Sequence, residues 1–492
     1  MSDIKQQNLT LAQSLDPACV LQHFAALSNI PRGSGNESGV ADFLVAFAEK
    51  NGLSCYRDAT NNVLIKVPAT KGHENAPTLL LQGHTDMVCE KNADTAHDFE
   101  NDPIRLILDG EYLRADGTTL GGDNGIAVAY MMALLESKDI PHPALECLFT
   151  SGEEVGMDGA IAFDYSQIRA THMINLDSED ERQITVGCAG GVRSDMTIPV
   201  VRRARGEDEA YLRVTLRGLC GGHSGEDINK GRAGANALLV RLLVTVSRDV
   251  CFDLVRIDGG SKDNAIPRES EAVICLPAEK CAVESMLMLQ HADAIGEELC
   301  AEDADCTVTC ERIEPTDDAP MDAASTAKVL RALHLVPHGV LKMSTQVKGL
   351  VEYSRNAGVL RTLCDAVVLR LSSRSCRESL LDHAQISLED YAALCGASVT
   401  HHDRYPGWEF APDSAVREAY IAAMDAVCGV RPTVAAIHAG LECGYIKLQC
   451  PQMDIISVGP NMKNIHSPDE QLHLPSVKRV WNVLLHLLES WA

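Results

Sequence analysis

The stretch TLLLQGHTD, residues 78–86, is the most informative part of the chain. A short apolar run, Thr78–Gln82, is followed at once by a glycine, a histidine and an aspartate. Runs of this length that end at a turn signal are typical of buried strands. Three further apolar runs are followed by acidic residues or histidine: Ala144–Thr150, His172–Leu176 and Met453–Val458. Polar groups that follow several strands predict a functional site at one edge of a sheet.

Helical patterns separate these strands. Apolar residues recur at helical spacing in Gly39–Gly52 and Gly125–Lys138, and a terminal helix is expected near Ser476–Trp491. Strands that alternate with helices indicate an α/β fold with a layered sheet. The middle of the chain alternates again, as in the strand Ala210–Arg217 and the helix Ala233–Arg248. No repeat is obvious there, although the region is long enough for two similar α/β units.

Composition narrows the class of protein. Of 492 residues 46% are hydrophobic, and Asp+Glu 69 against Lys+Arg 43 gives a net charge of -26. Such an acidic chain argues against nucleic-acid binding and against a polybasic membrane surface. The sequence shows neither a secretory signal nor an apolar run long enough to cross a membrane. The 18 cysteines are scattered without a CxxC pair, so reduced thiols and a cytoplasmic location are expected.

Acidic residues and histidines gather in five loops at expected strand ends or helix starts. They are His84, Asp86, Asp123, Glu153, Glu154, Asp177 and His466. Imidazole nitrogen and carboxylate oxygen are ligands of zinc and similar divalent ions. Two histidines and three carboxylates suffice for a two-metal site in which one carboxylate bridges. Such a pair of ions polarises a carbonyl and lowers the pKa of a shared water towards about 7.

Two of these residues remain for other roles. Asp86 lies two positions after His84 and is placed to hold its imidazole in one tautomer. Glu153 adjoins a ligand on what is expected to be an extended chain, so it would point to the opposite side and act as a general base. Each feature alone has an ordinary explanation, such as a solvated acidic face or a turn at GGDNG. Their joint occurrence favours a metal site.

Eight motifs in order carry a resemblance to a known family: QGHTDMV, TTLGGDNGIA, TSGEEVGMDGA, INLDSE, GGHSGEDI, NAIPRE, HAGLECG and VGPNMKNIHSPDEQ. From about residue 20 to its C-terminus the chain resembles the aminoacyl-histidine dipeptidases. These Xaa-His dipeptidases, also called cytosol non-specific dipeptidases or peptidase D, belong to the M20 metallopeptidase family. The resemblance implies a two-domain α/β fold. Residues 1–190 and 403–492 would form a catalytic domain with a mixed sheet, and residues 191–402 an inserted α/β lid domain.

The resemblance also implies roles for the clustered residues. His84 and Asp177 would bind one divalent ion, and Glu154 and His466 a second. Asp123 would bridge the two, Glu153 would be the catalytic base, and Asp86 would support His84. Zinc is the expected metal, with cobalt or manganese as alternatives. An aspartate at position 177 favours a dipeptidase or aminopeptidase over a carboxypeptidase or aminoacylase.

Six more residues are candidates for contacts with the substrate. The resemblance makes His223 a lid histidine that stabilises the oxyanion. Asn264, Arg268 and Arg374 would hold the substrate carboxylate, since a guanidinium binds a carboxylate with two parallel hydrogen bonds. The alternative for both arginines is a surface salt bridge. Glu442, in the same motif as His438, would pair with the free amino group of a dipeptide.

The predicted function is therefore dinuclear, metal-dependent hydrolysis of dipeptides, of the Xaa-His type and broader, with Glu153 as general base. Two alternatives stay open: an amide hydrolase acting on acylated amino acids or C-terminal residues, and a catalytically silent metal-stabilised scaffold. A homodimer is neither required nor excluded. The chain departs from the family at Asn229, where histidine is common, and in the acidic segment from Cys300 to Pro320.

Overall fold

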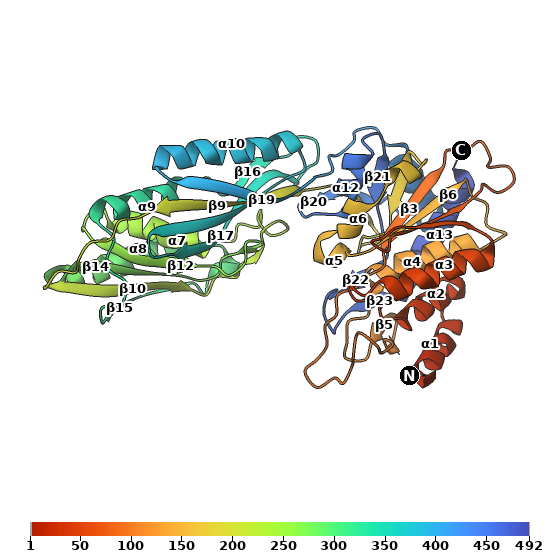
Figure 1. Cartoon of the computed structure of the whole chain (residues 1–492), viewed down its shortest axis with the longest axis horizontal. Coiled ribbons are helices and arrows are strands. Elements are labelled where there is room, and N and C mark those ends of the chain that lie inside the picture. The colour runs from red at the N-terminus through yellow and green to blue at the C-terminus, as the bar shows by residue number, and fades with distance from the viewer. Residues whose placement is uncertain (1, 492) are drawn as a thin grey trace. The chain divides into compact units, whose positions relative to one another are not determined.

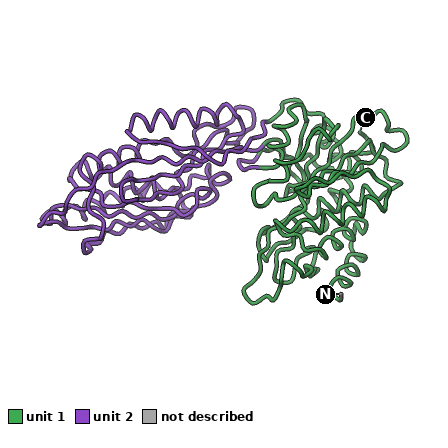
Figure 2. The backbone as a smooth tube through the Cα atoms, in the orientation of Figure 1, with its two compact units in different colours: residues 1–187, 410–436, 441–492 green, residues 188–409, 437–440 purple. Residues whose placement is uncertain are grey.

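The computed structural model describes residues 2–491, which form two compact units (Figure 2). Unit 1 contains the described chain as far as Gly187, the segment Phe410–Ala436 and the chain from Leu441 onward. Unit 2 contains Cys188–Glu409 and the short segment Ile437–Gly440. His438, which the sequence analysis assigned to the second part of the catalytic domain, therefore lies in unit 2. The division into a catalytic and a lid domain at residues 191 and 402 stays a prediction.

An eight-stranded mixed sheet forms the centre of unit 1, in the order β1-β2-β6-β3-β7-β21-β8-β20 (Figure 1). The strands are β1 (Ser54–Arg57), β2 (Val63–Val67), β3 (Leu79–His84), β6 (Leu145–Thr150), β7 (His172–Asn175), β8 (Gln183–Cys188), β20 (Thr433–Ile437) and β21 (Asp454–Ser457). The four strands β6, β3, β7 and β21 run parallel to one another. Their carboxyl ends therefore meet at one edge, as the sequence predicts.

Helices bury the faces of this sheet. Those of unit 1 are α1 (Ser2–Gln13), α2 (Ala18–Ser28), α3 (Ser38–Asn51), α4 (Gly122–Glu136), α5 (Glu153–Gly156), α6 (Asp158–Ala162), α11 (Ala415–Cys428), α12 (Glu442–Gln449) and α13 (Leu474–Ser490), with a 3₁₀ turn at Tyr165–Gln167. Helix α4 is buried along almost its whole length and packs on β3 and α2. Tyr130 of α4 stacks on Trp481 of α13, with ring centroids 6.0 Å apart. This packing fixes the N-terminal turn of α4, which carries Asp123.

A smaller four-stranded sheet completes unit 1, in the order β22-β23-β5-β4. Its strands are β4 (Leu106–Asp109), β5 (Tyr112–Ala115), β22 (Met462–Lys463) and β23 (Gln471–His473). The loop between β22 and β23 contains His466. That loop is therefore anchored at both of its ends by strand pairing.

Unit 2 contains a nine-stranded antiparallel sheet in the order β15-β10-β14-β12-β17-β18-β9-β19, with β16 also paired to β17. Its strands are β9 (Gly190–Pro199), β10 (Glu209–Arg217), β12 (Asp253–Gly259), β14 (Ser270–Pro277), β15 (Thr307–Ile313), β16 (Gly339–Met343), β17 (Val351–Thr362), β18 (Ala366–Ser375) and β19 (Ser398–Tyr405). The helices are α7 (Ala235–Val246), α8 (Cys281–Gly296), α9 (Ala323–Leu335) and α10 (Glu378–Cys395), with 3₁₀ turns at Ala278–Lys280 and Ala301–Asp303. A two-stranded ribbon pairs β11 (Gly222–His223) with β13 (Ala265–Ile266).

Two similar halves make up this sheet. One half is β10-α7-β12-β14-α8-β15, and the other is β9-α9-β17-β18-α10-β19. Each is a β-α-β-β-α-β unit in which the first chain strand lies between the third and the fourth. The halves meet where Gly259 of β12 pairs with Leu360 of β17. The repeat is not obvious in the sequence because the first half is inserted after the opening strand of the second.

The predicted elements differ from the structure mainly at their ends. Strand β3 continues to His84, and α4 begins at Gly122, so His84 and Asp123 lie within elements rather than in loops. The prediction of an extended chain at Glu153 was wrong, because Glu153 is the first residue of the short helix α5. Gly152, with φ of 63°, turns the chain directly from β6 into that helix.

None of the helices between residues 2 and 491 combines the length and apolar character needed to cross a lipid bilayer. Among residues 2–491, none of the 18 cysteines forms a disulfide.

Candidate active site

The carboxyl edge of the parallel strands in unit 1 collects most of the predicted site residues. His84 is the last residue of β3, Asp177 follows β7, and Glu154 follows β6 within α5. Asp123 comes from the first turn of α4, where its φ and ψ of -77° and 109° are not helical. His466 comes from the loop between β22 and β23, with φ of 61°. Five separate segments of one unit thus supply the cluster.

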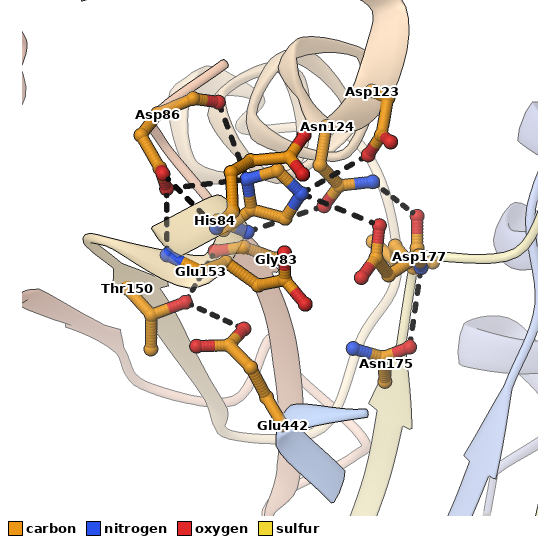
Figure 3. A network of polar contacts seen from close by, with 12 residues as sticks. Gly83, His84, Asp86, Asp123, Asn124, Thr150, Glu153, Asn175, Asp177 and Glu442 are labelled. Atoms are coloured by element: carbon orange, nitrogen blue, oxygen red, sulfur yellow. Dashed lines mark hydrogen bonds and ion pairs between the residues drawn. The ribbon is translucent and has the colours of Figure 1, made fainter. Parts of the chain in front are cut away.

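Asp123 occupies the centre of this cluster. Its Oδ1 lies 3.0 Å from Nε2 of His84, and its Oδ2 lies 3.1 Å from Nε2 of His466. Nε2 of His84 is also 3.6 Å from Oδ1 of Asp177 (Figure 3). Nε2 of His466 is also 3.1 Å from Oε1 of Glu154. Each imidazole therefore faces one oxygen of Asp123 and one further carboxylate, so the five side chains form two overlapping sets that share Asp123.

The donor set fits divalent cations. His84, Asp123 and Glu154 offer ligand atoms that all lie within 4.8 Å of one another, although His84 and Glu154 belong to different sets. Because Zn–N and Zn–O bonds are about 2.0–2.2 Å long, ligands of one zinc ion or of two neighbouring ions lie close together in this way. Nitrogen and carboxylate oxygen without thiolate are also the donors that suit zinc, manganese or cobalt. These residues could hold two cations, with one oxygen of Asp123 turned to each.

Electrostatics point the same way. Burial, with the charges of Asp123 and Glu154, raises the pKa of Asp177 to about 7, although His84 opposes the shift. Hydrogen bonds to Asp123 and Glu154 raise the pKa of His466 to about 10. Burial would raise the pKa of Asp123, but hydrogen bonds to His466 and His84 outweigh it and lower that pKa. Carboxylates crowded together in a buried site favour a bound positive charge.

Asp86 holds two parts of the cluster at once. One of its oxygens lies 3.3 Å from Nδ1 of His84, and the backbone amides of Glu153 and Glu154 donate to its two oxygens at 3.1 and 3.3 Å. The hydroxyl of Ser34 donates to it at 2.7 Å. Burial would raise the pKa of Asp86, but His84 and Ser34 lower it to about 2. Asp86 thus contacts both His84 and the start of α5, and its role in orienting the imidazole of His84 stays a prediction.

Two further glutamates lie beside the cluster without joining it. Burial raises the pKa of Glu153 well above its usual value; the charge of His84 opposes this, and the charges of Asp177 and Glu442 add to it. Glu442 is 1% exposed and accepts hydrogen bonds at Oε2 from Gln82 (2.6 Å) and Thr150 (2.8 Å). Its Oε1 has no hydrogen-bond partner among the described residues. Glu442 therefore keeps one acceptor free beside the cluster (Figure 3).

Sequence reasoning missed the amides that tie these strands together. Asn124 accepts a hydrogen bond from the amide of His84 at 3.2 Å and donates to the carbonyl of Leu176 at 2.9 Å. Asn175 accepts from the amide of Asp177 at 3.2 Å and donates to Gln82 at 2.6 Å. Their position next to predicted ligands, in GGDNG and INLDSE, was the available signal.

Three of the predicted substrate-binding residues come together within unit 2. Nδ1 of His223 accepts a hydrogen bond from the amide of Glu226 at 3.2 Å, so a neutral ring carries its proton on Nε2. Burial and then the charge of Arg374 lower the pKa of His223, and the same two causes lower that of His438 to about 3. Arg374 is 7% exposed and donates from Nη1 to Tyr405 at 2.8 Å, while its Nε has no partner in the described structure.

Among residues 2–491, no side-chain hydrogen bond or ion pair joins Asn264 or Arg268 to that group. Asn264 is exposed, and its carbonyl accepts the amide of Ser224 at 2.9 Å. Arg268 is exposed, and its Nε donates to the carbonyl of Leu219 at 3.1 Å. Both residues therefore contact the loop that contains His223, and their role in binding the substrate carboxylate stays a prediction.

The α/β fold and the carboxylate–imidazole cluster indicate a metal-binding protein. Comparison with known proteins identifies its family. The sequence model of peptidase family M20/M25/M40 matches residues 80–490, and the chain belongs to this family. It is 38% identical over 476 residues to the cytosol non-specific dipeptidase of Escherichia coli, covering 97% of this chain and 98% of that protein.

Solved structures agree with the sequence comparison. The aminoacylhistidine dipeptidase of Vibrio alginolyticus superposes with a TM-score of 0.93 at 38% identity, covering 98% of both chains. An aminopeptidase from Bacillus cereus superposes with a TM-score of 0.55 at 16% identity over 96% of this chain and 98% of that one, which is a likeness of fold alone. The predicted family and the two-domain α/β fold class are thereby confirmed.

Proposed function

We propose that the chain is a metal-dependent dipeptidase that hydrolyses dipeptides, including those of the Xaa-His type. The observation that carries the proposal is the arrangement of His84, Asp177, His466 and Glu154 around Asp123. The names of the relatives from Escherichia coli and Vibrio alginolyticus, both matched over nearly their whole length, supply the substrate class.

Two divalent cations, zinc in the first instance, would be held by this cluster. His84 and Asp177 would bind one, Glu154 and His466 the other, and Asp123 both, because each set presents nitrogen and carboxylate oxygen together. When bound, the cations act as Lewis acids that polarise the peptide carbonyl and acidify a water molecule. Asp86 keeps Nδ1 of His84 engaged, so that Nε2 is the nitrogen available for coordination.

Glu153 is proposed to move the protons. Its carboxylate would take a proton from the attacking water and then deliver that proton to the nitrogen of the leaving amine. Burial, with the charges of neighbouring carboxylates, raises its pKa well above the usual value of a glutamate, which suits a group that must both accept and release a proton. The amide of Glu153 is held by Asp86, which fixes the position of this side chain at the start of α5.

The ends and the carbonyl of a dipeptide find complementary groups. The free Oε1 of Glu442 would accept the amino group, which limits the substrate to short peptides with a free N-terminus. Arg374, with Asn264, Arg268 and His438, would bind the carboxylate. His223 would donate from Nε2 to the developing oxyanion. Residues 191–402 are proposed to act as the lid domain that contributes these groups.

We also propose a cytoplasmic location, which the cysteines without disulfides and the name of the Escherichia coli relative support. A homodimer, or His223 supplied by a partner subunit, remains an alternative to a self-sufficient monomer. The competing function is hydrolysis of acylated amino acids or release of C-terminal residues. The family resemblance argues against it, because an aspartate at position 177 favours a dipeptidase or aminopeptidase.

The test is turnover by purified protein that has been stripped with a chelator and then reloaded. Xaa-His and other dipeptides, N-acetylated amino acids and N-acetylated dipeptides are compared as substrates. We expect dipeptide hydrolysis to disappear on chelation, to return with zinc, cobalt or manganese, and to exceed hydrolysis of the acetylated compounds. Chelator-resistant turnover, or a preference for the acetylated compounds, would contradict the proposal.

A further inference from the structure

The glycine-rich loop Leu120–Asp123 is held by a buried carboxylate that is distant in sequence. Oε2 of Glu470 accepts the backbone amides of Leu120 and Gly121 at 2.8 and 3.1 Å. Oε1 accepts those of Gly122 and Asp123 at 2.8 and 3.3 Å. These amides stand at the N-terminus of α4, where helix donors have no intrahelical partner and favour negative charge. Glu470, 2% exposed, thus caps the helix that carries the shared aspartate.

A buried arginine binds the carbonyl groups of the same region. Arg32 is 2% exposed and donates from Nη2 to the carbonyl of Gly121 at 2.5 Å. Its Nη1 donates to the carbonyls of Thr85 and Asp86 at 2.9 and 3.1 Å. Arg32 therefore joins the end of β3, just after His84, to the loop before Asp123. The sequence analysis assigned no role to Arg32 or Glu470.

The glycines of the GGDNG motif make room for these two side chains. A Cβ at Gly121 or Gly125 would lie 2.5 or 2.6 Å from Nη2 of Arg32, closer than real Cβ atoms approach. A Cβ at Gly122 would lie 3.2 Å from Oε1 of Glu470. The spacing of glycines in this motif is thus explained by the approach of Arg32 and Glu470 to the backbone.

Glu470 also belongs to the loop that carries His466. The amide of Glu470 donates to the carbonyl of Ser467 at 3.1 Å, and the hydroxyl of Ser467 donates to the carbonyl of Asn464 at 2.7 Å. The imidazole of His466 is 45% exposed, whereas that of His84 is 1% exposed at the end of a central strand. His466 therefore depends on its loop for its position far more than His84 does.

We propose that Glu470 is a positioning residue that holds Asp123 and His466 in place for the cation bound by Glu154 and His466. Arg32 holds Asp123 and His84 in place for the cation bound by His84 and Asp177. This inference rests on the proposed two-cation function. Loss of the Glu470 carboxylate should weaken the cation held by Glu154 and His466 more than the cation held by His84 and Asp177. Substitutions of residues that orient metal ligands typically lower metal affinity by about 10- to 100-fold.

The test titrates zinc into metal-free protein and measures both affinities by calorimetry, with elemental analysis after equilibrium dialysis. We expect wild type to bind two ions, and Glu470→Gln to bind one with nearly unchanged affinity and the second about 10- to 100-fold more weakly. The amide of glutamine would turn a donor towards backbone amides that need an acceptor. Glu470→Asp, which keeps the charge on a shorter side chain, should lose the same ion and serves if the glutamine variant does not fold.

The matched control is Glu146→Gln in the same unit. Glu146 is 2% exposed and accepts the backbone amides of Arg169 and Ala170 at 2.9 and 3.0 Å, but it contacts no residue of the cluster. The Glu146→Gln substitution should lower thermal stability and leave both zinc affinities unchanged. Two ions bound by the Glu470 variants with wild-type affinity, or equal losses in the control, would overturn the inference.

Dipeptide turnover on the same samples separates this inference from the proposed function. If the Glu470 variants selectively lose the ion of Glu154 and His466 but the wild-type protein hydrolyses no dipeptide, the role of Glu470 is upheld and the proposed dipeptidase activity is refuted. If the wild-type protein hydrolyses dipeptides but the Glu470 variants retain both ions, the dipeptidase activity is upheld and the role of Glu470 is refuted.

Discussion

The polar clusters of unit 1 and unit 2 have opposite charge. In unit 1, carboxylates surround two imidazoles, and the pKa of Asp177 rises to about 7 through burial and neighbouring negative charge. In unit 2, Arg374 lies beside two histidines, and burial with its positive charge lowers the pKa of His438 to about 3. The first cluster favours cations and the second favours an anion. If the proposed function holds, the chain keeps metal binding and recognition of the substrate carboxylate in two separate clusters.

The largest expected effect comes from two adjacent glutamates of unit 1. Glu153→Gln should lower kcat for dipeptides by about 10²- to 10⁴-fold, the usual contribution of a general base, and should keep bound zinc. Glu154→Gln is the matched variant and should lose one ion, because its carboxylate faces His466. Kinetics and elemental analysis on the same preparations check both. Full turnover in Glu153→Gln would remove the assigned base.

The guanidinium of the unit 2 cluster is tested by Arg374→Lys. Lysine keeps the charge but not the planar fork, so the loss of one charged hydrogen bond, about 1.5–3 kcal/mol, should lower kcat/KM roughly 10- to 150-fold. The fall should appear mainly in KM, with zinc affinity unchanged.

Arg355→Lys on the neighbouring strand is the control for Arg374→Lys. The guanidinium of Arg355 is 1% exposed and already bonded to Ser373, Tyr353 and Ala384, so its loss should reduce stability rather than substrate affinity. Equal KM values for Arg374→Lys and wild type would show that the unit 2 cluster does not bind the substrate carboxylate.

A smaller effect is expected from a lone buried carboxylate in unit 2. Glu284 is 0% exposed with no partner for either oxygen in the described structure, and burial raises its pKa to about 7. The folded state therefore binds a proton more tightly than the unfolded state, so the stability that this group allows below pH 4.5 is lost as pH rises to 7. Removing the charge with Glu284→Gln should therefore recover about 3 kcal/mol more at pH 8 than at pH 4.5.

Thermal unfolding against pH measures this difference, with the exposed residue Glu311 changed to Gln as the control. Parallel pH profiles for wild type and Glu284→Gln would show that Glu284 is not buried as a charge.

The sequence predicted the site residues more completely than their backbone geometry. His84, Asp177 and Glu154 could be anticipated because short apolar runs announce parallel strands, and the ends of such strands converge. The helix at Glu153 could not, because the left-handed turn at Gly152 depends on the packing after β6. Glu470 and Arg32 were missed because their partners are backbone atoms distant in sequence, which no residue pattern reveals.

The two halves of unit 2 were equally hidden from the sequence. Strand β9 pairs with β18 and β19, although one complete β-α-β-β-α-β unit is inserted between β9 and those strands. Such an insertion interrupts any regular spacing along the chain. By contrast, the four parallel strands of the unit 1 sheet could be anticipated because each of them is followed by a polar motif.

The most direct measurement is a zinc titration of metal-free wild type and Asp123→Ala. If Asp123 stands between two cations, wild type binds two ions per chain, and the variant loses affinity for both at once, whereas Glu154→Gln loses only one. Two ions bound by Asp123→Ala with wild-type affinity, or a wild type that binds no more than one, would contradict the shared site.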